Sequence, residues 1–315
     1  AAAPRASLQR QNPGTTAGTR RHPHSRINPQ GKGFIMANMS RRSFLQLFGA
    51  SAAAVAGLGL VGCGGSSDSG SASKLEAVKK NGKLKAGVKK DVPGYGYLDP
   101  ATNKYEGLEI DLCYQIAAKV FDVSYDDAKS KDLVEFTDVT PKTRGPLIDN
   151  DQLDIVCATY TITDERKQSW DFSTPYRTDY IGLLIKKGTI SDLAGLDGKI
   201  IGVSQGSTTK DNITKMLTEQ NVSATPQFQE FPDYPSIKSA LDSGNIDVFS
   251  VDRSILGGYI DDSTELLCPD VKFGKQEYGV STKKGSDLSK TVDDIVNECL
   301  GNGWLDEEIK TWNLL

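Results

Sequence analysis

Short apolar runs alternate with segments of helical periodicity from residue 83 onward. Residues 83–88 alternate polar and apolar side chains, as a strand does, and 154–157 is a short apolar run that suits a buried strand. Leu112, Ile116 and Val120 recur every four residues and predict a helix with one buried face. Also predicted in this half are a loop at 89–97, Asp111 as a helix N-cap, a strand at 134–139 and a helix at 141–148. This strand–helix order indicates a parallel open sheet.

The same alternation restarts at residue 199 and predicts a second α/β lobe. The predicted strands of this half are 199–203, 228–231 and 246–251, and the predicted helices are 206–218, 235–242, 253–259, 286–300 and 305–312. The apolar segment at 181–185 predicts a strand long enough to cross between the lobes, and 275–280 is the expected return crossing. Two lobes joined in this way form a cleft with strand ends on both sides, where open α/β sheets bind ligands.

Export signals precede this body. The heptapeptide 40–46, Ser-Arg-Arg-Ser-Phe-Leu-Gln, matches the twin-arginine export signature. The apolar core that follows at 47–61 is too short to span a membrane and is only weakly hydrophobic. Leu-Val-Gly-Cys at 60–63 looks like a lipobox, in which Cys63 is acylated and becomes the mature N-terminus. The alternative is a buried N-terminal helix.

The first 35 residues show almost no apolar periodicity and are rich in Arg, Gly, Pro, Gln and Thr, so we expect the start of translation at Met36 or Met39. The predicted organisation is an artefactual or disordered extension at 1–35, a signal peptide at 36–62, a lipidated cysteine with a flexible tether at 63–81, lobe 1 at 82–178 plus 275–315, and lobe 2 at 179–274.

Charge and composition exclude several classes of function. From Cys63 onward the chain has 29 basic and 41 acidic residues, a net charge of −12, which argues against nucleic-acid binding. His22 and His24, the only histidines, precede the signal, so histidine-based catalysis and zinc–histidine sites are excluded from the exported body. The remaining cysteines lack metal-ligand spacing, and any disulfide among them cannot be paired from sequence: Cys113, Cys157, Cys268 and Cys299. We expect no cofactor and no metal.

Candidate chemistry is concentrated just after the predicted strand at 154–157. Thr159 and Thr161 are followed by Arg166, and hydroxyls at the mouth of a strand with a nearby guanidinium can grip a carboxylate. Thr163 or Asp164 can cap the helix that carries Arg166. These residues alone favour the plainer interpretation, a capped helix with a solvated arginine.

Residues 159–166, Thr-Tyr-Thr-Ile-Thr-Asp-Glu-Arg, and 172–176, Phe-Ser-Thr-Pro-Tyr, resemble the bacterial extracellular solute-binding proteins, family 3, which serve polar amino-acid ABC transporters. The resemblance covers residues 83–315. It implies the two-lobe type II periplasmic-binding-protein fold, in which each lobe is an open sheet flanked by helices. It also implies that Arg166 holds the α-carboxylate of the ligand, assisted by Thr159 and Thr161.

Two further positions gain a meaning from the resemblance. Gly206-Ser207-Thr208-Thr209 opens a predicted helix, whose free amides can bind an anion, although an ordinary strand–helix turn explains it equally well. In the family, Ser207 and Thr208 would complete the grip on the α-carboxylate. Asp252 ends a predicted strand, where an acid is usually a helix cap, but the family places an acid there to bind the α-ammonium.

Arg144 and Lys89 bear on the choice of ligand. The stretch from Thr140 to Leu147, Thr-x-x-x-Arg-x-x-Leu, and a basic residue soon after the first strand resemble the glutamate- and aspartate-binding members. Two cations would neutralise the side-chain carboxylate of such a ligand. The alternative for Arg144 is a position on a solvated helix face. Possible pocket walls are Tyr97, Tyr160 and Tyr234, with Tyr95 beside them, although loop aromatics often serve packing alone.

The sequence thus predicts an exported lipoprotein that is anchored to the membrane outside the cytoplasm. It would capture L-glutamate or L-aspartate by lobe closure and deliver it to an ABC permease. We expect no nucleic-acid binding and no enzymatic activity. Glutamine or another polar amino acid is the alternative ligand. An enzyme on the same fold, similar to the dehydratases among the family's relatives, would need a cleft carboxyl, for which Glu109 and Glu277 are candidates. A sensor or adhesin role also stays open.

Overall fold

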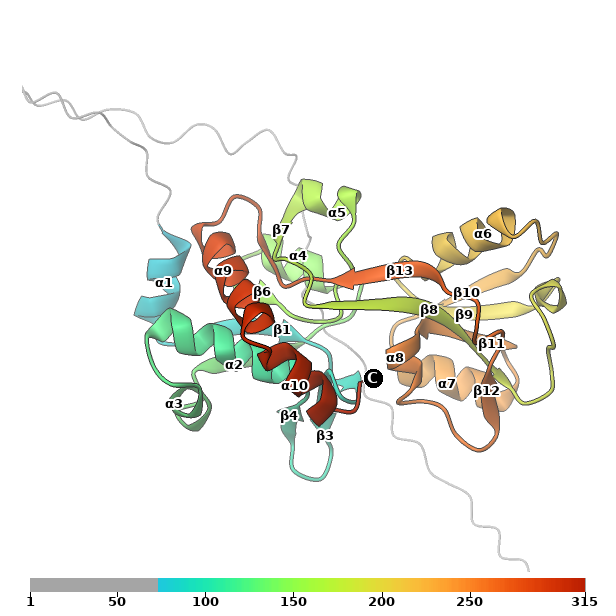
Figure 1. Ribbon diagram of the computed structural model, residues 1–315, viewed down its shortest axis with the longest axis horizontal. Helices are drawn as coiled ribbons and strands as arrows, with labels where there is room; N and C mark the ends of the chain where they lie inside the picture. The colour runs from blue at the N-terminus through green and yellow to red at the C-terminus, as the bar shows by residue number, and fades with distance from the viewer. Residues whose placement is uncertain (1–72, 315) are drawn as a thin grey trace, which may run out of the picture. The chain divides into compact units, whose positions relative to one another are not determined.

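The structure, a computed structural model, describes residues 73–314. The predictions for 1–35, for the signal peptide at 36–62, for Cys63 and for the tether up to residue 72 lie outside the described residues. Two sheets carry helices of their own, and two long strands, β8 (Arg177–Lys186) and β13 (Phe273–Tyr278), run between them (Figure 1). The predicted two-lobe α/β fold is therefore confirmed.

Lobe 1 is built on a five-stranded sheet with the order β5-β1-β6-β14-β7. Its strands are β1 (Leu84–Val88), β5 (Val134–Asp138), β6 (Ile155–Val156), β7 (Trp170–Phe172) and β14 (Ser281–Lys283). β1 pairs in parallel with β5 and β6, whereas β14 is antiparallel to β6 and β7. The predicted parallel pairing of the first three strands is confirmed, and β14, which the sequence did not predict, is antiparallel because the chain returning from lobe 2 enters this sheet in the opposite direction.

The helices of lobe 1 come from both ends of the described chain. They are α1 (Lys74–Asn81), α2 (Leu108–Phe121), α3 (Tyr125–Ser130), α4 (Arg144–Asp149), α5 (Asp164–Ser169), α9 (Asp287–Gly301) and α10 (Trp304–Thr311). The predicted loop contains part of a small antiparallel sheet instead, formed by β2 (Asp91–Val92), β3 (Gly96–Asp99) and β4 (Lys104–Glu106). No helix in the described range is long and apolar enough to cross a membrane.

Two local predictions in lobe 1 were wrong. The tether does not extend to residue 81, because Ser73 caps α1 through a hydrogen bond from Glu76 N (3.1 Å) and Lys74 N donates to Asp287 (2.9 Å). Asp111 is not a helix N-cap. Gly107 occupies that position with φ 127°, and a Cβ there would lie 2.2 Å from the carbonyl oxygen of Tyr95, so only glycine fits.

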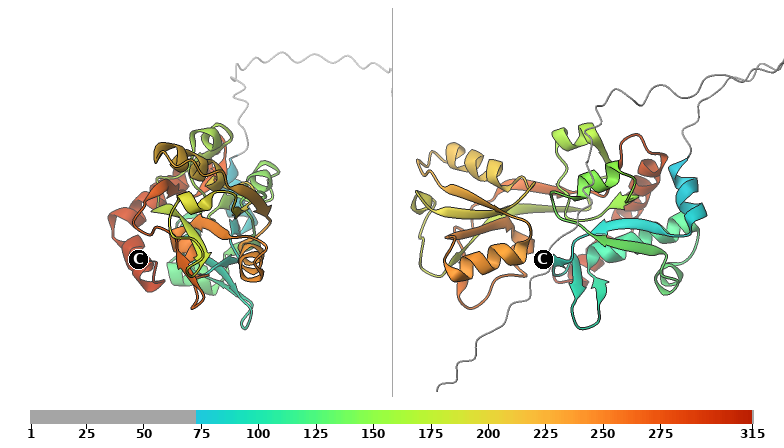
Figure 2. Two further views of the ribbon diagram at one scale, coloured as in Figure 1. Left: turned by 90° about the vertical axis from the view of Figure 1, so that its right-hand side faces the viewer. Right: turned by 180° about the vertical axis from the view of Figure 1, so that it is seen from behind.

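Lobe 2 is built on a sheet with the order β10-β9-β11-β8-β12, with β13 also paired to β8. Its further strands are β9 (Ile200–Ser204), β10 (Gln227–Phe231), β11 (Val248–Asp252) and β12 (Thr264–Leu266). Its helices are η1 (Ala194–Leu196), α6 (Thr209–Glu219), α7 (Tyr234–Ser243) and α8 (Arg253–Leu256). α6 and α7 cover opposite faces of this sheet (Figure 2), because alternate residues of a strand point to opposite sides.

The crossing strands pair antiparallel with each other over Arg177–Ile181 and Phe273–Tyr278. Thr161 of lobe 1 forms an isolated bridge to Tyr278 where β13 ends. The proposed lobe boundaries at 178/179 and 274/275 both fall inside these two strands. The crossing strands therefore bring the residues after β6 close to the residues that end β11.

Candidate functional site

The candidate site is a cleft lined by residues of both lobes. Its cavity has a volume of about 20 Å³ and is lined by Pro141, Arg144, Thr159, Thr161, Arg166, Ser207, Thr208, Thr209, Tyr234, Val251, Asp252 and Gln276. A wider recess of about 470 Å³ shares Pro141, Arg166, Ser207 and Thr208 with it. About 20 Å³ is room for roughly one water molecule, whereas small-molecule sites usually have about 300–1,000 Å³. Entry of an organic ligand therefore requires the lobes to move apart.

Arg166 lies in α5, whose N-cap Thr163 accepts a hydrogen bond from Arg166 N (3.1 Å). Its Nη1 donates to the carbonyl oxygen of Thr161 (2.7 Å), and its Nη2 donates across the cleft to the carbonyl oxygen of Gly206 (3.1 Å). Burial, and then the charge of Arg144, lower the pKa of Arg166 to about 10. The guanidinium stays charged at neutral pH and can pair with an anion inside the cleft. The alternative of a solvated arginine does not fit this geometry.

Thr159 and Thr161 are both buried beside Arg166. Thr159 has a positive φ of 44°, which is uncommon for a residue other than glycine and turns the chain sharply after β6. Its N–H donates to Glu109 Oε1 (2.5 Å). The hydroxyl of Thr161 donates to Gln276 Oε1 (2.5 Å). Both threonines thus have backbone or side-chain groups held in place next to the guanidinium.

Ser207 and Thr208 form the turn that begins α6 on lobe 2. Thr208 donates from its hydroxyl to Gln276 Oε1 (3.0 Å), the atom that also accepts from Thr161. The hydroxyl of Ser207 is buried and has no hydrogen-bond partner within residues 73–314. Gly206 has φ 75°, and a Cβ there would lie 3.0 Å from the Cα atom of Lys142 on lobe 1. The turn therefore presents a free hydroxyl and the N-terminal amides of a helix to the cleft.

Asp252 lies at the end of β11, opposite Arg166, and is 6% exposed. Its Oδ2 accepts a hydrogen bond from the hydroxyl of Tyr278, and its side chain makes no capping bond to α8 among the described atoms. Burial, and then the charge of Asp179, raise the pKa of Asp252 to about 7. Asp252 therefore occupies the N-cap position of α8, but its side chain does not act as the cap. A cation placed here would stabilise the ionised carboxylate.

Arg144 is almost fully buried where α4 meets the cleft. Its Nη1 donates to the carbonyl oxygens of Ala158 (2.6 Å) and Thr159 (3.2 Å), and its guanidinium carbon lies 3.7 Å from the ring centroid of Tyr160. Its Nε has no hydrogen-bond partner in the described part of the chain. Burial is the main cause that lowers its pKa. Arg144 is not the solvated side chain that the sequence left open.

Lys89 is 1% exposed and lies behind the cleft, outside the residues that line the cavity. Its Nζ is 3.0 Å from Asp91 Oδ1 and 4.5 Å from the ring centroid of Tyr234. Burial lowers its pKa, and Asp91 opposes that shift. The structure thus brings Arg144 to the cavity wall but places Lys89 one layer away, already paired with an acid.

The three predicted wall tyrosines have different positions. Tyr234 lines the cavity, and Tyr160 lines the recess, where it lies 4.9 Å from the guanidinium of Arg166. Tyr97 is partly exposed in β3, where it pairs with Asp91 and Glu106, and it lines neither space. The site brings together all predicted ligand-contact residues except Lys89 and Tyr97.

Sequence reasoning missed Gln276 and Asp179. Gln276 on β13 accepts from hydroxyls of both lobes, and Asp179 on β8 accepts from Ser254 N (3.0 Å). Both lie on the crossing strands, and nothing in the local sequence pattern distinguishes them. Only their position on segments expected to pass the cleft could have drawn attention to them.

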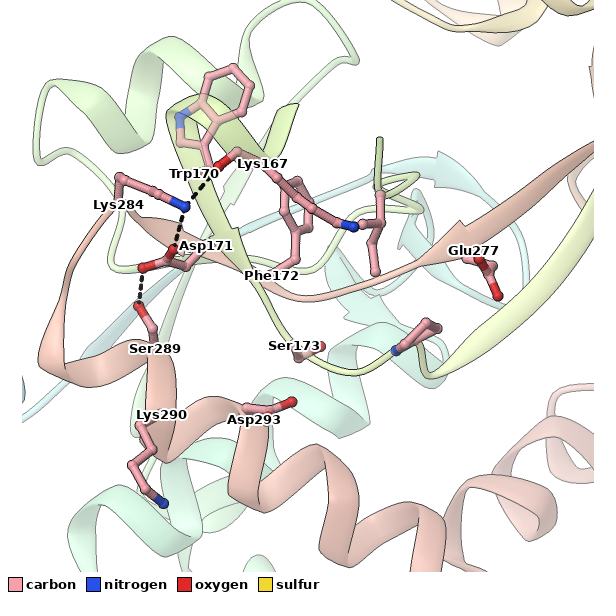
Figure 3. A pocket seen from close by; sticks show the side chains of 12 residues that line it. Lys167, Trp170, Asp171, Phe172, Ser173, Glu277, Lys284, Ser289, Lys290 and Asp293 are labelled. Atoms are coloured by element: carbon pink, nitrogen blue, oxygen red, sulfur yellow. Dashed lines mark hydrogen bonds and ion pairs between the residues drawn. The ribbon is translucent and has the colours of Figure 1, made fainter. Parts of the chain in front are cut away.

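A second pocket, on the surface of lobe 1, lies outside the cleft (Figure 3). It has a volume of about 540 Å³ and lies between β7 and α9, where Lys284 pairs with Asp171 (2.9 Å) and Ser289 donates to the same carboxylate (3.1 Å). Glu277, a candidate acid for an enzyme, lines this pocket and pairs with Lys275 (2.7 Å). Glu277 is therefore not a cleft residue.

Residues 73–314 contain no group of His, Cys, Asp and Glu side chains arranged to hold a metal ion. The four cysteines in this range are free thiols: Cys113, Cys157, Cys268 and Cys299. The described cleft therefore offers hydrogen-bond donors, two guanidinium groups and a carboxylate. Such a set can bind a small zwitterion through its charged ends.

Comparison with known proteins agrees with this geometry. The ABC transporter glutamine-binding protein GlnH of Bacillus subtilis (strain 168) is 35% identical over 264 residues, covering 80% of this chain and 91% of that protein. The glutamate-binding protein GluB of Corynebacterium efficiens is 31% identical over 278 residues, covering 84% and 88%. An ancestral arginine-binding protein with arginine bound superposes with a TM-score of 0.62 at 27% identity, covering 73% and 98%. Residues 84–314 match the profile of the bacterial extracellular solute-binding proteins, family 3, and the chain belongs to this family.

Proposed function

We propose that the chain binds L-glutamate or L-aspartate in the cleft between its lobes. As the substrate-binding component of an amino-acid ABC importer, it would deliver this ligand to the permease. The observation that carries the choice of ligand is Arg144, a buried guanidinium on the cavity wall. Among the described residues no carboxylate lies within 4.0 Å of it. A buried cation without an ionic partner is unfavourable, so an acidic ligand side chain would stabilise it.

The two charged ends of an α-amino acid match the two sides of the cleft. Arg166 and the turn at Ser207 and Thr208 would bind the α-carboxylate, assisted by Thr159 and Thr161. Asp252 would bind the α-ammonium from lobe 2. Because these groups come from both lobes, the full set of contacts forms only in a closed cleft, and ligand binding would favour closure.

L-glutamine is the second candidate, for one specific reason. Lys89 already pairs with Asp91 at 3.0 Å, so this second cation needs no acidic ligand. The relatives of the chain include both glutamine- and glutamate-binding proteins. The charge of Arg144 favours glutamate, and the pairing of Lys89 weakens that preference without reversing it.

A calorimetric titration of the purified protein with each of the twenty amino acids tests the proposal. We expect the tightest binding for glutamate or aspartate, with glutamine weaker by about fivefold or more, since a charged hydrogen bond contributes about 1 kcal/mol more than a neutral one. Tighter binding of glutamine or arginine would refute the dicarboxylate assignment. A parallel assay for loss of the ligand over hours distinguishes binding from turnover.

We also propose that the protein is exported by the twin-arginine route and anchored through lipid on Cys63, outside the cytoplasm. The support is the order of Arg41, Arg42 and Cys63 along the sequence. Cys63→Ala should move the protein from the membrane fraction to the soluble exported fraction. Arg41→Lys with Arg42→Lys should retain it in the cell, and normal export of that double variant would point to the general secretory route.

A further inference from the structure

A buried carboxyl, Glu109 of α2, lies directly behind the cavity wall. It is 0% exposed, and its Oε1 accepts hydrogen bonds from Thr159 N (2.5 Å) and from the hydroxyl of Tyr176. Its Oε2 has no hydrogen-bond partner among residues 73–314. A half-satisfied carboxyl in a closed interior is unfavourable in its ionised form unless nearby cations stabilise it.

Glu109 and Arg144 hold the same residue from two sides. Glu109 accepts from the N–H of Thr159, and Arg144 donates to the carbonyl oxygen of Thr159 (3.2 Å). No nitrogen of Arg144 lies within 4.0 Å of a carboxylate oxygen of Glu109, so the two do not form a salt bridge. Arg144 Nε and Glu109 Oε2 both lack a hydrogen-bond partner in the described structure. Arg144 lines the cavity and shares Thr159 with Glu109, so its positive charge acts on the buried carboxyl as well as on the cleft.

Two bases and three weak acids surround Glu109, and burial lowers the pKa of both bases. They come from every element packed against it and are Lys89 after β1, Tyr95 between β2 and β3, Arg144 on α4, Cys157 after β6, and Tyr176 before β8. Burial raises the pKa of the Tyr95 and Tyr176 hydroxyls and of the Cys157 thiol, so these groups stay neutral. Burial also raises the pKa of Glu109 to about 7, against the hydrogen bonds and the two cations.

We propose that Glu109 is a specificity-determining residue that takes up a proton when the cleft binds a dicarboxylic amino acid and not when it binds the corresponding amide. This inference rests on the proposed binding site. A ligand carboxylate beside Arg144 brings a second negative charge to the cation that stabilises ionised Glu109, so the ionised form of Glu109 becomes less favourable. The free ligand carboxyl has a pKa of about 4.3, so Glu109 is the group that takes the proton. A neutral amide leaves the charge of Glu109 unchanged.

The proposal has a thermodynamic consequence. Proton uptake on binding makes the affinity for glutamate fall as the pH rises through the pKa of free Glu109. With that pKa at about 7, the dissociation constant for glutamate should rise about tenfold relative to that for glutamine between pH 6 and pH 8. At pH 8 the excess uptake should approach about one proton per glutamate.

The test is calorimetry at pH 8 in buffers of different ionisation enthalpy, with glutamate and with glutamine. Asp252, whose pKa is also about 7, faces the α-ammonium that both ligands carry, so its contribution cancels in the difference between them. Equal proton counts for the two ligands in the unaltered protein would overturn the proposal, and this measurement needs no variant. Glu109→Gln, which retains an acceptor for Thr159 N–H, should abolish the excess, whereas Glu277→Gln on the surface should preserve it.

The results separate the two proposals. A protein that binds glutamate with no excess proton overturns the role of Glu109 and leaves the dicarboxylate site intact. A protein that binds no glutamate overturns both. An excess that persists in Glu109→Gln assigns the proton to another group and overturns the role of Glu109.

Discussion

Replacing Arg144 with methionine removes the charge that the proposed ligand choice depends on and keeps an apolar stem to pack against Tyr160. In the structure this guanidinium is 3% exposed and lies 3.7 Å from the Tyr160 ring centroid. Its loss leaves a ligand carboxylate without its buried partner, which costs about 3–5 kcal/mol. A ligand amide loses only an ordinary hydrogen bond of about 1 kcal/mol. The difference of about 2–4 kcal/mol corresponds to roughly 30–1,000-fold in relative affinity.

The assay is the ratio of the dissociation constants for glutamate and glutamine, measured by calorimetry at pH 6.5 or below, so that Glu109 is largely protonated. The ratio removes losses common to both ligands, such as those that follow when the carbonyl oxygens of Ala158 and Thr159 lose their donor. Lys142→Met is the matched control. Lys142 is exposed and lies two residues before Arg144 in the sequence, and its substitution also removes one positive charge. A ratio that changes less than threefold in Arg144→Met would refute the reasoning and make Arg144 a support of the wall.

Three further predictions follow from the same geometry. Arg166→Ala should weaken the binding of glutamate and of glutamine alike, by about 2–5 kcal/mol each. If calorimetry shows a loss of binding for one ligand only, Arg166 does not bind the α-carboxylate that both ligands carry. Asp252 must be ionised to hold an α-ammonium, so binding of glutamine should strengthen from pH 6 to pH 8, and Asp252→Asn should remove that pH dependence. For glutamate the proton taken up by Glu109 opposes this gain, so its affinity should change much less over the same range. The raised pKa of Glu109 means that the folded protein binds this proton more tightly than the unfolded chain does, so the free energy of unfolding falls as the pH rises from about 4.5 to about 7. In Glu109→Gln, denaturant unfolding should show a fall that is smaller by up to about 3 kcal/mol. An unchanged fall would contradict the pKa assigned to Glu109.

The elements of the fold could be predicted where local periodicity decides the structure. The i+4 pattern at Leu112, Ile116 and Val120 corresponds to α2, and the short apolar runs correspond to strands of both sheets. Strand direction at β14 could not be predicted in this way, because it depends on how the chain returns from lobe 2. The N-cap residue of α2 could not be predicted either, because the close approach of Gly107 to the Tyr95 carbonyl is a contact between residues twelve positions apart.

The residues of the candidate site also fall into those that could be predicted from the sequence and those that could not. Arg166, Ser207 and Asp252 stand next to strand ends in the sequence, so their placement at a cleft could be expected from topology alone. The difference between Arg144 on the wall and Lys89 behind it could not, because it depends on Asp91, which pairs with Lys89 only after β2 folds back. Glu109 was weighed only as a possible enzyme acid. Its contact with Thr159 links residues fifty positions apart and becomes visible only in the folded chain.

Closure and recognition depend on overlapping groups. Bonds that span the lobes include Arg166 to the Gly206 carbonyl (3.1 Å), Tyr95 to Ser254 (3.0 Å) and Tyr234 N to Asp91 (3.2 Å). Each such bond contributes about 1 kcal/mol net, so a few of them hold the lobes together only weakly against the freedom of the open form. A ligand can shift that equilibrium only by binding the closed form more tightly than the open one. Because Arg166 and Asp252 stand on opposite lobes, a zwitterion that touches both would provide this difference, and under the proposed ligand choice the side-chain charge beside Arg144 would decide which zwitterion binds best.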